Sequence, residues 1–271
     1  MATILEYANE VAVYVGNGAK VQEVPKANGV TKVGIVVNQG KICPTVYIDQ
    51  MYEEGIPAQQ AAAMVMDIAE KNRAEGKFDI EKFLDYDGFV KPRLRIRLYN
   101  KATEAEVKRS AASRGFKDLI IVPYVDLPDF NGGGSIKIKK EHVKKWGVTE
   151  KEVIDTALKN SADDVVVKDL FGMVQDMMDL NLPTDGDNKP LYVSNKAGNC
   201  GASAILGLLP SLKKKYKNGF FVLPSSIHEV LVMPSTGNED IDSLTAMVQD
   251  VNATEVLPEE RLADMAFGFG V

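Results

Sequence analysis

Apolar and polar positions along this chain repeat with two different periods, which predict helices and strands respectively. Ala8, Val11 and Val15 recur at helical spacing, so the first segment is expected to be a helix packed on one side. Alternation with a period of two predicts strands. The Asn28-Gly29 pair separates two such runs and is typical of a tight hairpin turn.

The same patterns predict elements along the rest of the chain. Strands are expected at residues 20–26, 30–37, 42–48, 93–98, 119–125, 135–139, 191–194, 219–223 and 227–233. Helices are expected after Pro57, after the Thr149 and Glu152 capping box, at about 169–180, at about 201–217, at 241–251 and from Pro258. This order predicts an α+β fold with mixed or antiparallel sheets and packed helices. We expect a single large domain over residues 1–271; the alternative is a division into 1–130 and 131–271.

Composition places the chain among globular proteins of ordinary make-up. Of its 271 residues, 45% are hydrophobic and 26% charged. No apolar run approaches the roughly 20 residues that span a bilayer, so no membrane segment is expected. The first ten residues lack the basic start of a secretory signal. Cys43 and Cys200 lie far apart and form no disulfide framework, which favours a reducing compartment and a cytoplasmic protein.

The net charge of −6 argues against a dedicated nucleic-acid binder, because phosphate binding needs a basic face. Charge is nevertheless uneven. Arg93, Arg95 and Arg97 alternate with apolar residues, so a strand here is expected to carry three arginines on one face. Solvated surface is the plainer interpretation, and an anion-binding surface is the alternative. Two further basic stretches are Lys137, Lys139, Lys140, Lys144 and Lys145, and Lys213, Lys214, Lys215 and Lys217.

A polar cluster interrupts two hydrophobic runs near the end of the chain. It contains Ser225, Ser226, His228 and Glu229, and one of the two histidines of the protein is here. On a strand, Ser226 and His228 would share a face, with Cβ atoms about 7 Å apart, which is awkward for direct proton transfer. The cluster is therefore interpreted first as a structural turn, then as a binding site, and last as a catalytic site.

Cys200 is the second candidate for chemistry. It lies at the expected start of a helix, where the macrodipole lowers the pKa of a thiol, and His228 follows on a later strand. A buried, inert cysteine is the default interpretation. Because His142, His228, Cys43 and Cys200 have no ligand spacing, neither a metal nor a cofactor is expected. The Asn131–Gly134 segment is interpreted as a hairpin loop, since no Gly-Lys-Ser or Gly-Lys-Thr follows it.

Several blocks of the sequence together resemble one bacterial family, the domain-of-unknown-function family 5688 of Firmicutes and their mobile elements. The blocks are Asn28–Val30, Pro44–Ile48 with Tyr52-Glu53, Glu141-His142, Trp146–Thr149, Leu191–Lys196, Gly201-Ala202, Leu223–Val230, Val251-Asn252 and Thr254–Val256. The resemblance implies a cytosolic bacterial or phage-borne protein. It supplies no established activity.

Three functional hypotheses follow from the residues. The first is a non-catalytic binding or interaction protein of a bacterial or mobile-element system, with a host protein or a small anionic ligand as partner. The second is a small hydrolase or transferase that uses His228 with Ser226 or Cys200. The third is nucleic-acid or anion binding through the lysine and arginine patches.

Overall fold

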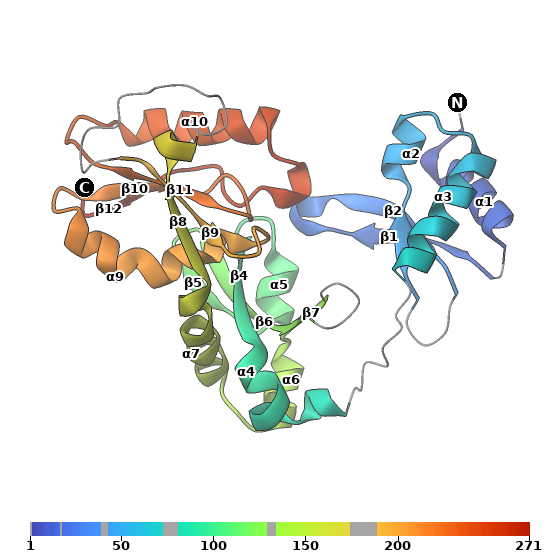
Figure 1. Ribbon diagram of the computed structural model, residues 1–271, viewed down its shortest axis with the longest axis horizontal. Coiled ribbons are helices and arrows are strands. Elements are labelled where there is room, and N and C mark those ends of the chain that lie inside the picture. The colour runs from blue at the N-terminus through green and yellow to red at the C-terminus, as the bar shows by residue number, and fades with distance from the viewer. Residues whose placement is uncertain (1, 17, 39–42, 73–80, 129–133, 174–188) are drawn as a thin grey trace. The chain divides into compact units, whose positions relative to one another are not determined.

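The computed structural model describes residues 2–16, 18–38, 43–72, 81–128, 134–173 and 189–271 (Figure 1). Contacts divide the chain into two units, one made of residues 1–79 and 127–134 and the other of residues 80–126 and 135–271. In both units helices pack on sheets, and the strand pairs whose register is described are antiparallel. The predicted α+β class is confirmed. The predicted number of domains stays a prediction.

The first unit is a three-stranded sheet covered by helices. Its elements are α1 (Ile4–Val15), β1 (Lys20–Pro25), a 3-10 turn (Ala27–Gly29), β2 (Thr31–Val36), β3 (Thr45–Tyr47), α2 (Asp49–Glu53) and α3 (Ala58–Lys71). The sheet order is β1-β2-β3. The Asn28-Gly29 turn closes the first hairpin, with φ of 58° and 74°, as the sequence predicts. Val11, Ile35 and Val65 are fully buried and join α1, β2 and α3 in one core.

The second unit contains two sheets and the helices that cover them. Its first half is a 3-10 turn (Lys82–Leu84), a π-helical turn (Tyr86–Val90), α4 (Lys91–Arg93), β4 (Leu94–Asn100), α5 (Ala105–Ser110), β5 (Arg114–Phe116), β6 (Leu119–Leu127), β7 (Gly134–Lys137), α6 (Lys140–Trp146) and α7 (Glu150–Ser161). Its second half is β8 (Val165–Asp169), β9 (Leu191–Asn195), a 3-10 turn (Gly201–Ala204), α9 (Ile205–Lys215), β10 (Phe220–Leu223), β11 (Val230–Pro234), α10 (Ile241–Thr254), a 3-10 turn (Pro258–Glu260) and β12 (Phe267–Phe269).

The larger sheet has the order β12-β10-β11-β9-β8. Helix α10 lies on one side of it and α9 on the other (Figure 1). Phe221 and Leu223 of β10 pack against Leu244 and Val248 of α10 in one buried cluster. Burying each such side chain stabilises the fold by about 1.5–3 kcal/mol, so this cluster holds α10 over the sheet. Both ends of the loop between β10 and β11 are thereby anchored to a packed sheet.

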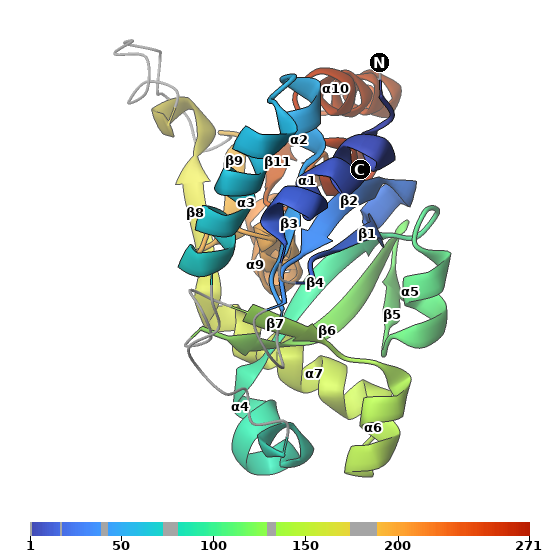
Figure 2. The ribbon, with the colours of Figure 1, turned by 90° about the vertical axis from the view of Figure 1, so that its right-hand side faces the viewer.

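The smaller sheet has the order β4-β6-β5, and β7 also pairs with β6. Leu94, Ile96 and Leu98 of β4 are buried, and the residues between them are only partly buried. This alternation confirms the predicted strand. Val107 and Ala111, at and just after α5, pack on residues of β6, and Figure 2 shows α5 alongside β5.

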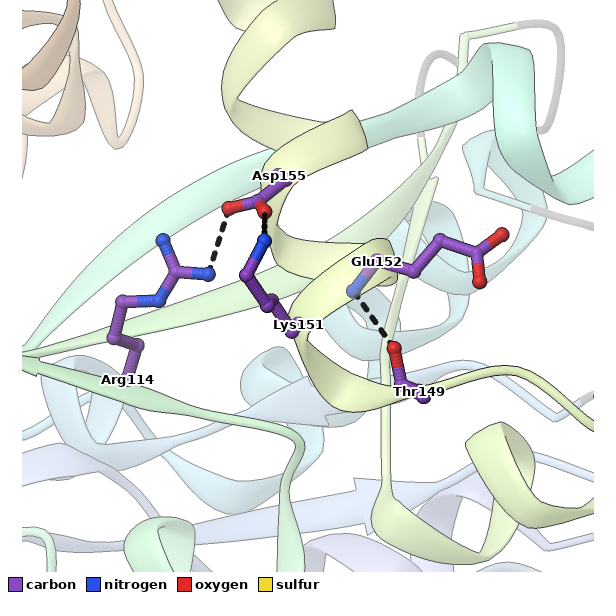
Figure 3. Close-up of polar contacts among 5 residues, drawn as sticks. All are labelled: Arg114, Thr149, Lys151, Glu152 and Asp155. Atoms are coloured by element: carbon purple, nitrogen blue, oxygen red, sulfur yellow. Dashed lines mark hydrogen bonds and ion pairs between the residues drawn. The ribbon is translucent and has the colours of Figure 1, made fainter.

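Helix α7 is fixed at its start by a cap and along its length by an ion pair (Figure 3). The Thr149 hydroxyl accepts a hydrogen bond from the backbone N–H of Glu152 at 3.1 Å. The predicted return bond from the Glu152 side chain is not formed, so only half of the capping box is present. Asp155 accepts from Arg114 of β5 and from Lys151, each at 2.7 Å, which ties α7 to the smaller sheet.

Some predicted boundaries are wrong in the last third of the chain, beginning at the polar cluster Ser225–Glu229. The predicted strand 227–233 begins only at Val230, because Ile227 N–H donates to the Glu260 carbonyl and leaves the sheet ladder. Pro258 opens a single 3-10 turn, and the strand β12 that follows is not predicted. Strand β8 is also not predicted. Three predicted segments lie partly outside the described residues. These parts are residues 131–133 of the predicted loop, 174–180 of the predicted helix and residue 42 of the predicted strand.

Candidate functional site

The polar cluster Ser225–Glu229 forms a loop between β10 and β11, held from one side by the chain after α10. Backbone N–H groups of Leu262 and Ala263 donate to the carbonyls of Ser225 and Pro224, each at 3.0 Å. The buried Ser226 Oγ accepts from the backbone N–H of His228 at 3.0 Å. This serine turn competes with strand pairing. Ser226 and His228 therefore do not lie side by side on a strand, and the sequence-based geometry is corrected.

Both ring nitrogens of His228 are engaged. Nδ1 accepts a hydrogen bond from the backbone N–H of Cys200 at 3.2 Å, and Nε2 lies 3.3 Å from Glu260 Oε1. An accepting Nδ1 places the proton of the neutral ring on Nε2, where it faces the carboxylate. The His228 carbonyl accepts from the Ser194 hydroxyl at 2.7 Å. In this arrangement His228 has no free nitrogen to take a proton from Ser226 or from the Cys200 thiol.

Cys200 follows β9 in a left-handed conformation, with φ of 51°, just before the 3-10 turn Gly201–Ala204. Its thiol is partly buried and donates to the Asn199 side-chain carbonyl at 3.2 Å. Burial raises the pKa of this thiol, the positive charge of Arg97 opposes the rise, and Glu260 adds to it. Desolvation thus acts against a reactive thiolate, which agrees with the default interpretation of a buried cysteine. The thiol is neutral at neutral pH.

An open pocket of about 450 Å³ lies beside His228. We call it the acidic pocket; it is lined by Gly198, Ser225, Ser226, His228, Glu229, Val251, Glu255, Val256 and Glu260. The predicted cluster supplies four of these residues, and the chain around the end of α10 supplies others. Glu255 and Glu260 were not predicted, because only the tertiary fold brings the residues after α10 to this loop.

The acidic pocket has negative electrostatic character. Three carboxylates line it, at Glu229, Glu255 and Glu260, and neither lysine nor arginine is among the described residues of its lining. Glu255 is also the C-cap of α10, and the C-terminal end of a helix carries partial negative charge. These groups disfavour an anionic ligand and favour a positively charged one. The pocket is also open enough for a side chain from solution to enter.

The three arginines do not form one row. Arg93 ends α4, donates to the Phe89 carbonyl and lies with its guanidinium 4.4 Å from the centre of the Phe89 ring. Arg95 and Arg97 are on β4 and share a face. Arg95 donates to the backbone carbonyls of Pro92 and Leu94. The prediction of a three-arginine face is corrected to two, because the strand begins at Leu94.

Comparison with known proteins identifies the family. The model of a family of unknown function, DUF5688, matches residues 5–270, nearly the whole chain. The chain belongs to this family. No curated protein and no solved structure matches the chain. The resemblance seen in the sequence blocks is thus confirmed, and the DUF5688 family supplies no activity.

Two further properties of this DUF5688 chain bear on its chemistry. Among the residues that the structure describes, no group of three or more His, Cys, Asp or Glu side chains could hold a metal ion. Within the same part of the chain, every helix is too short or too polar to cross a membrane.

Proposed function

We propose that this chain is a non-catalytic binding protein, and that the acidic pocket receives a positively charged side chain of a protein partner. The observation that carries the proposal is the lining of the pocket, in which the described residues include three carboxylates, at Glu229, Glu255 and Glu260, and neither lysine nor arginine. The hydrogen bond from Cys200 N–H to His228 Nδ1 supports binding over turnover, because it occupies the nitrogen that would serve as a base. A lysine or arginine side chain would complement this lining.

The organism and the cellular location in which this protein acts are part of the same proposal. A bacterial host, a phage or mobile-element origin and a cytoplasmic location are what the family resemblance and the two separate cysteines favour. The partner would then be a cytoplasmic host protein with an exposed lysine or arginine. The net charge of −6 also favours basic partners over acidic ones.

Labelled peptides test this proposal. Short peptides that contain lysine or arginine are titrated by fluorescence anisotropy against the full chain, beside the same peptides with acetyl-lysine or citrulline. We expect the charged peptides to bind, their affinity to fall with salt, and Glu255→Gln to weaken binding about fivefold through loss of one ion pair. The matched control is Glu152→Gln, an exposed glutamate of α7 outside the pocket, which should bind as the unmodified protein does.

Two results would contradict the proposal. One is equal binding of the charged and neutralised peptides, which would remove the role of charge. The other is unchanged binding by Glu255→Gln and Glu229→Gln, which would place the binding surface elsewhere. Circular dichroism of both variants confirms that they fold.

A small hydrolase or transferase is the alternative, and the His228–Glu260 pair is the observation that favours it. A carboxylate on one imidazole nitrogen orients the ring in many acyl-transfer sites, and the other nitrogen then serves as base. Here that second nitrogen accepts from Cys200 N–H. This function would therefore need the Cys200 loop to move. Turnover that survives His228→Ala unchanged would exclude it.

A further inference from the structure

A second polar cluster lies on the smaller sheet of the second unit, apart from the acidic pocket's lining. We call it the Arg97 cluster; it comprises Arg97 and Tyr99 of β4, Tyr124 of β6 and Lys137 of β7. The guanidinium carbon of Arg97 lies 4.3 Å from the centre of the Tyr124 ring, and Lys137 Nζ lies 4.8 Å from the centre of the Tyr99 ring. The charge of Arg97 also acts on the Tyr99 phenol. Three strands thus bring two cations and two phenols together.

The positive charge of the cluster is not neutralised by an ion pair. Among the described residues, no carboxylate lies within ion-pair distance of Arg97 or Lys137. The Arg97 Nε is buried, and it has no hydrogen-bond partner within the described part of the chain. A buried donor without a partner costs about 1–3 kcal/mol. A ligand that accepts hydrogen bonds from the other guanidinium nitrogens would neutralise the charge of Arg97.

The phenols and the thiol around Arg97 are neutral. Burial raises the pKa values of the Tyr99 and Tyr124 phenols, and Arg97 opposes both rises. The Cys200 thiol, which also feels the charge of Arg97, has a raised pKa as well. Phenols and thiol are therefore uncharged at neutral pH. Three carboxylates act on members of this surrounding through their charge: Glu104 on Lys137 and Tyr99, Asp126 on Tyr124, and Glu260 on Cys200.

Arg97 and Lys137 are two like charges whose repulsion is felt within this cluster. Desolvation lowers the pKa of Lys137, Glu104 opposes this, and Arg97 and Lys139 lower it further. Repulsion between partly desolvated cations is unfavourable in the free protein and becomes favourable when an anion binds between them. A guanidinium beside an ammonium is also a common way to hold a phosphate group.

We propose that the Arg97 cluster binds a phosphate group of a small molecule, with the Arg97 guanidinium and the Lys137 ammonium as its two cationic contacts. The size of the cluster favours a small ligand over a polynucleotide. Arg93 lies over Phe89, and Arg95 is bound to backbone carbonyls, so neither extends the cluster into the long basic stripe that a nucleic-acid backbone requires. The proposal does not depend on the function of the acidic pocket.

The test is isothermal titration calorimetry at constant ionic strength, in which the full chain is titrated with inorganic phosphate, pyrophosphate and adenosine monophosphate. We expect saturable binding, weakened about tenfold or more by Arg97→Gln and by Lys137→Gln, because each variant removes one charge-assisted contact. The matched control is Arg109→Gln, which removes the same charge from an exposed arginine of α5 and should bind normally. The three ligands distinguish a free phosphate from an organic ester.

Several results would overturn the proposal. No saturable binding of any of the three ligands by the unmodified chain would do so, as would equal binding by Arg97→Gln and Arg109→Gln. A third is tight binding of a single-stranded oligonucleotide that pyrophosphate does not displace, which would assign the face to nucleic acid. If Arg97→Gln fails to fold by circular dichroism, the more exposed Lys137→Gln decides the question. A loss of phosphate binding with intact peptide binding separates this site from the acidic pocket.

Discussion

At the scale of single residues, Gly201 decides whether the loop after β9 can meet the His228 loop. A Cβ at this position would lie 2.5 Å from the Asn195 backbone nitrogen and 2.7 Å from the His228 carbonyl oxygen. Real Cβ atoms do not approach backbone so closely. The contact between Cys200 N–H and His228 Nδ1 depends on this approach, because Cys200 immediately precedes the glycine.

We therefore expect Gly201→Ala to destabilise the protein by about 1–3 kcal/mol, the cost of overpacking against atoms that cannot move aside. Urea denaturation measures this loss. The control is Gly207→Ala in α9, where the nearest atom to an added Cβ is 4.0 Å away. That variant should be neutral or more stable by up to about 1 kcal/mol, since alanine favours a helix. Equal stabilities of the two variants would refute the steric argument.

At the scale of elements, the spacing of apolar residues is enough to predict a helix or a strand where the segment packs on one face. The hairpin at Asn28-Gly29, strand β4 and helix α10 follow from local patterns. The start of β11 does not follow from a local pattern. Ser226 Oγ accepts a hydrogen bond from His228 N–H, so a turn forms there in place of strand pairing. The site was half predictable for the same reason. His228 and Ser226 are neighbours in the sequence. Glu260 meets His228, and Tyr124 meets Arg97 of the other cluster, only through tertiary contacts.

The start of α7 offers a test of capping in which the sequence and the structure disagree. The sequence predicts a reciprocal box, but only the Thr149 hydroxyl makes its bond. Thr149→Ala should thus cost about 1 kcal/mol, whereas Glu152→Ala should cost much less. Thermal unfolding of both variants measures the difference. Equal losses would indicate that the glutamate caps the helix after all.

At the scale of the whole molecule, the response to acid is set by carboxylates in both units. The pKa values of Glu6, Asp155, Asp169, Glu239 and Asp240 are all lowered by hydrogen bonds. A lowered pKa in the folded state means that these groups stabilise the fold above their ordinary pKa and lose that contribution as the pH falls. Stability should accordingly decline on the acid side.

Glu239 is the strongest case. Hydrogen bonds from the Thr236 side chain and backbone, and then from the Ser235 hydroxyl, lower its pKa from 4.5 to about 2. Its contribution is complete above pH 4.5 and disappears between pH 4.5 and about 2. Glu239→Gln should flatten the decline in stability over that interval, as measured by urea denaturation at a series of pH values. A variant as acid-sensitive as the unmodified protein would contradict this.

The position of β12 has a consequence for the order in which the protein can be built. Residues 267–269 pair with β10, and the Phe269 ring stacks on Phe220 with centres 5.1 Å apart. Strand β10 is made almost fifty residues earlier, so its edge has no neighbour on that side while the chain is still emerging from the ribosome. Unpaired strand edges invite association with other chains. The strand that shields this edge is therefore synthesised after the other four strands of the larger sheet.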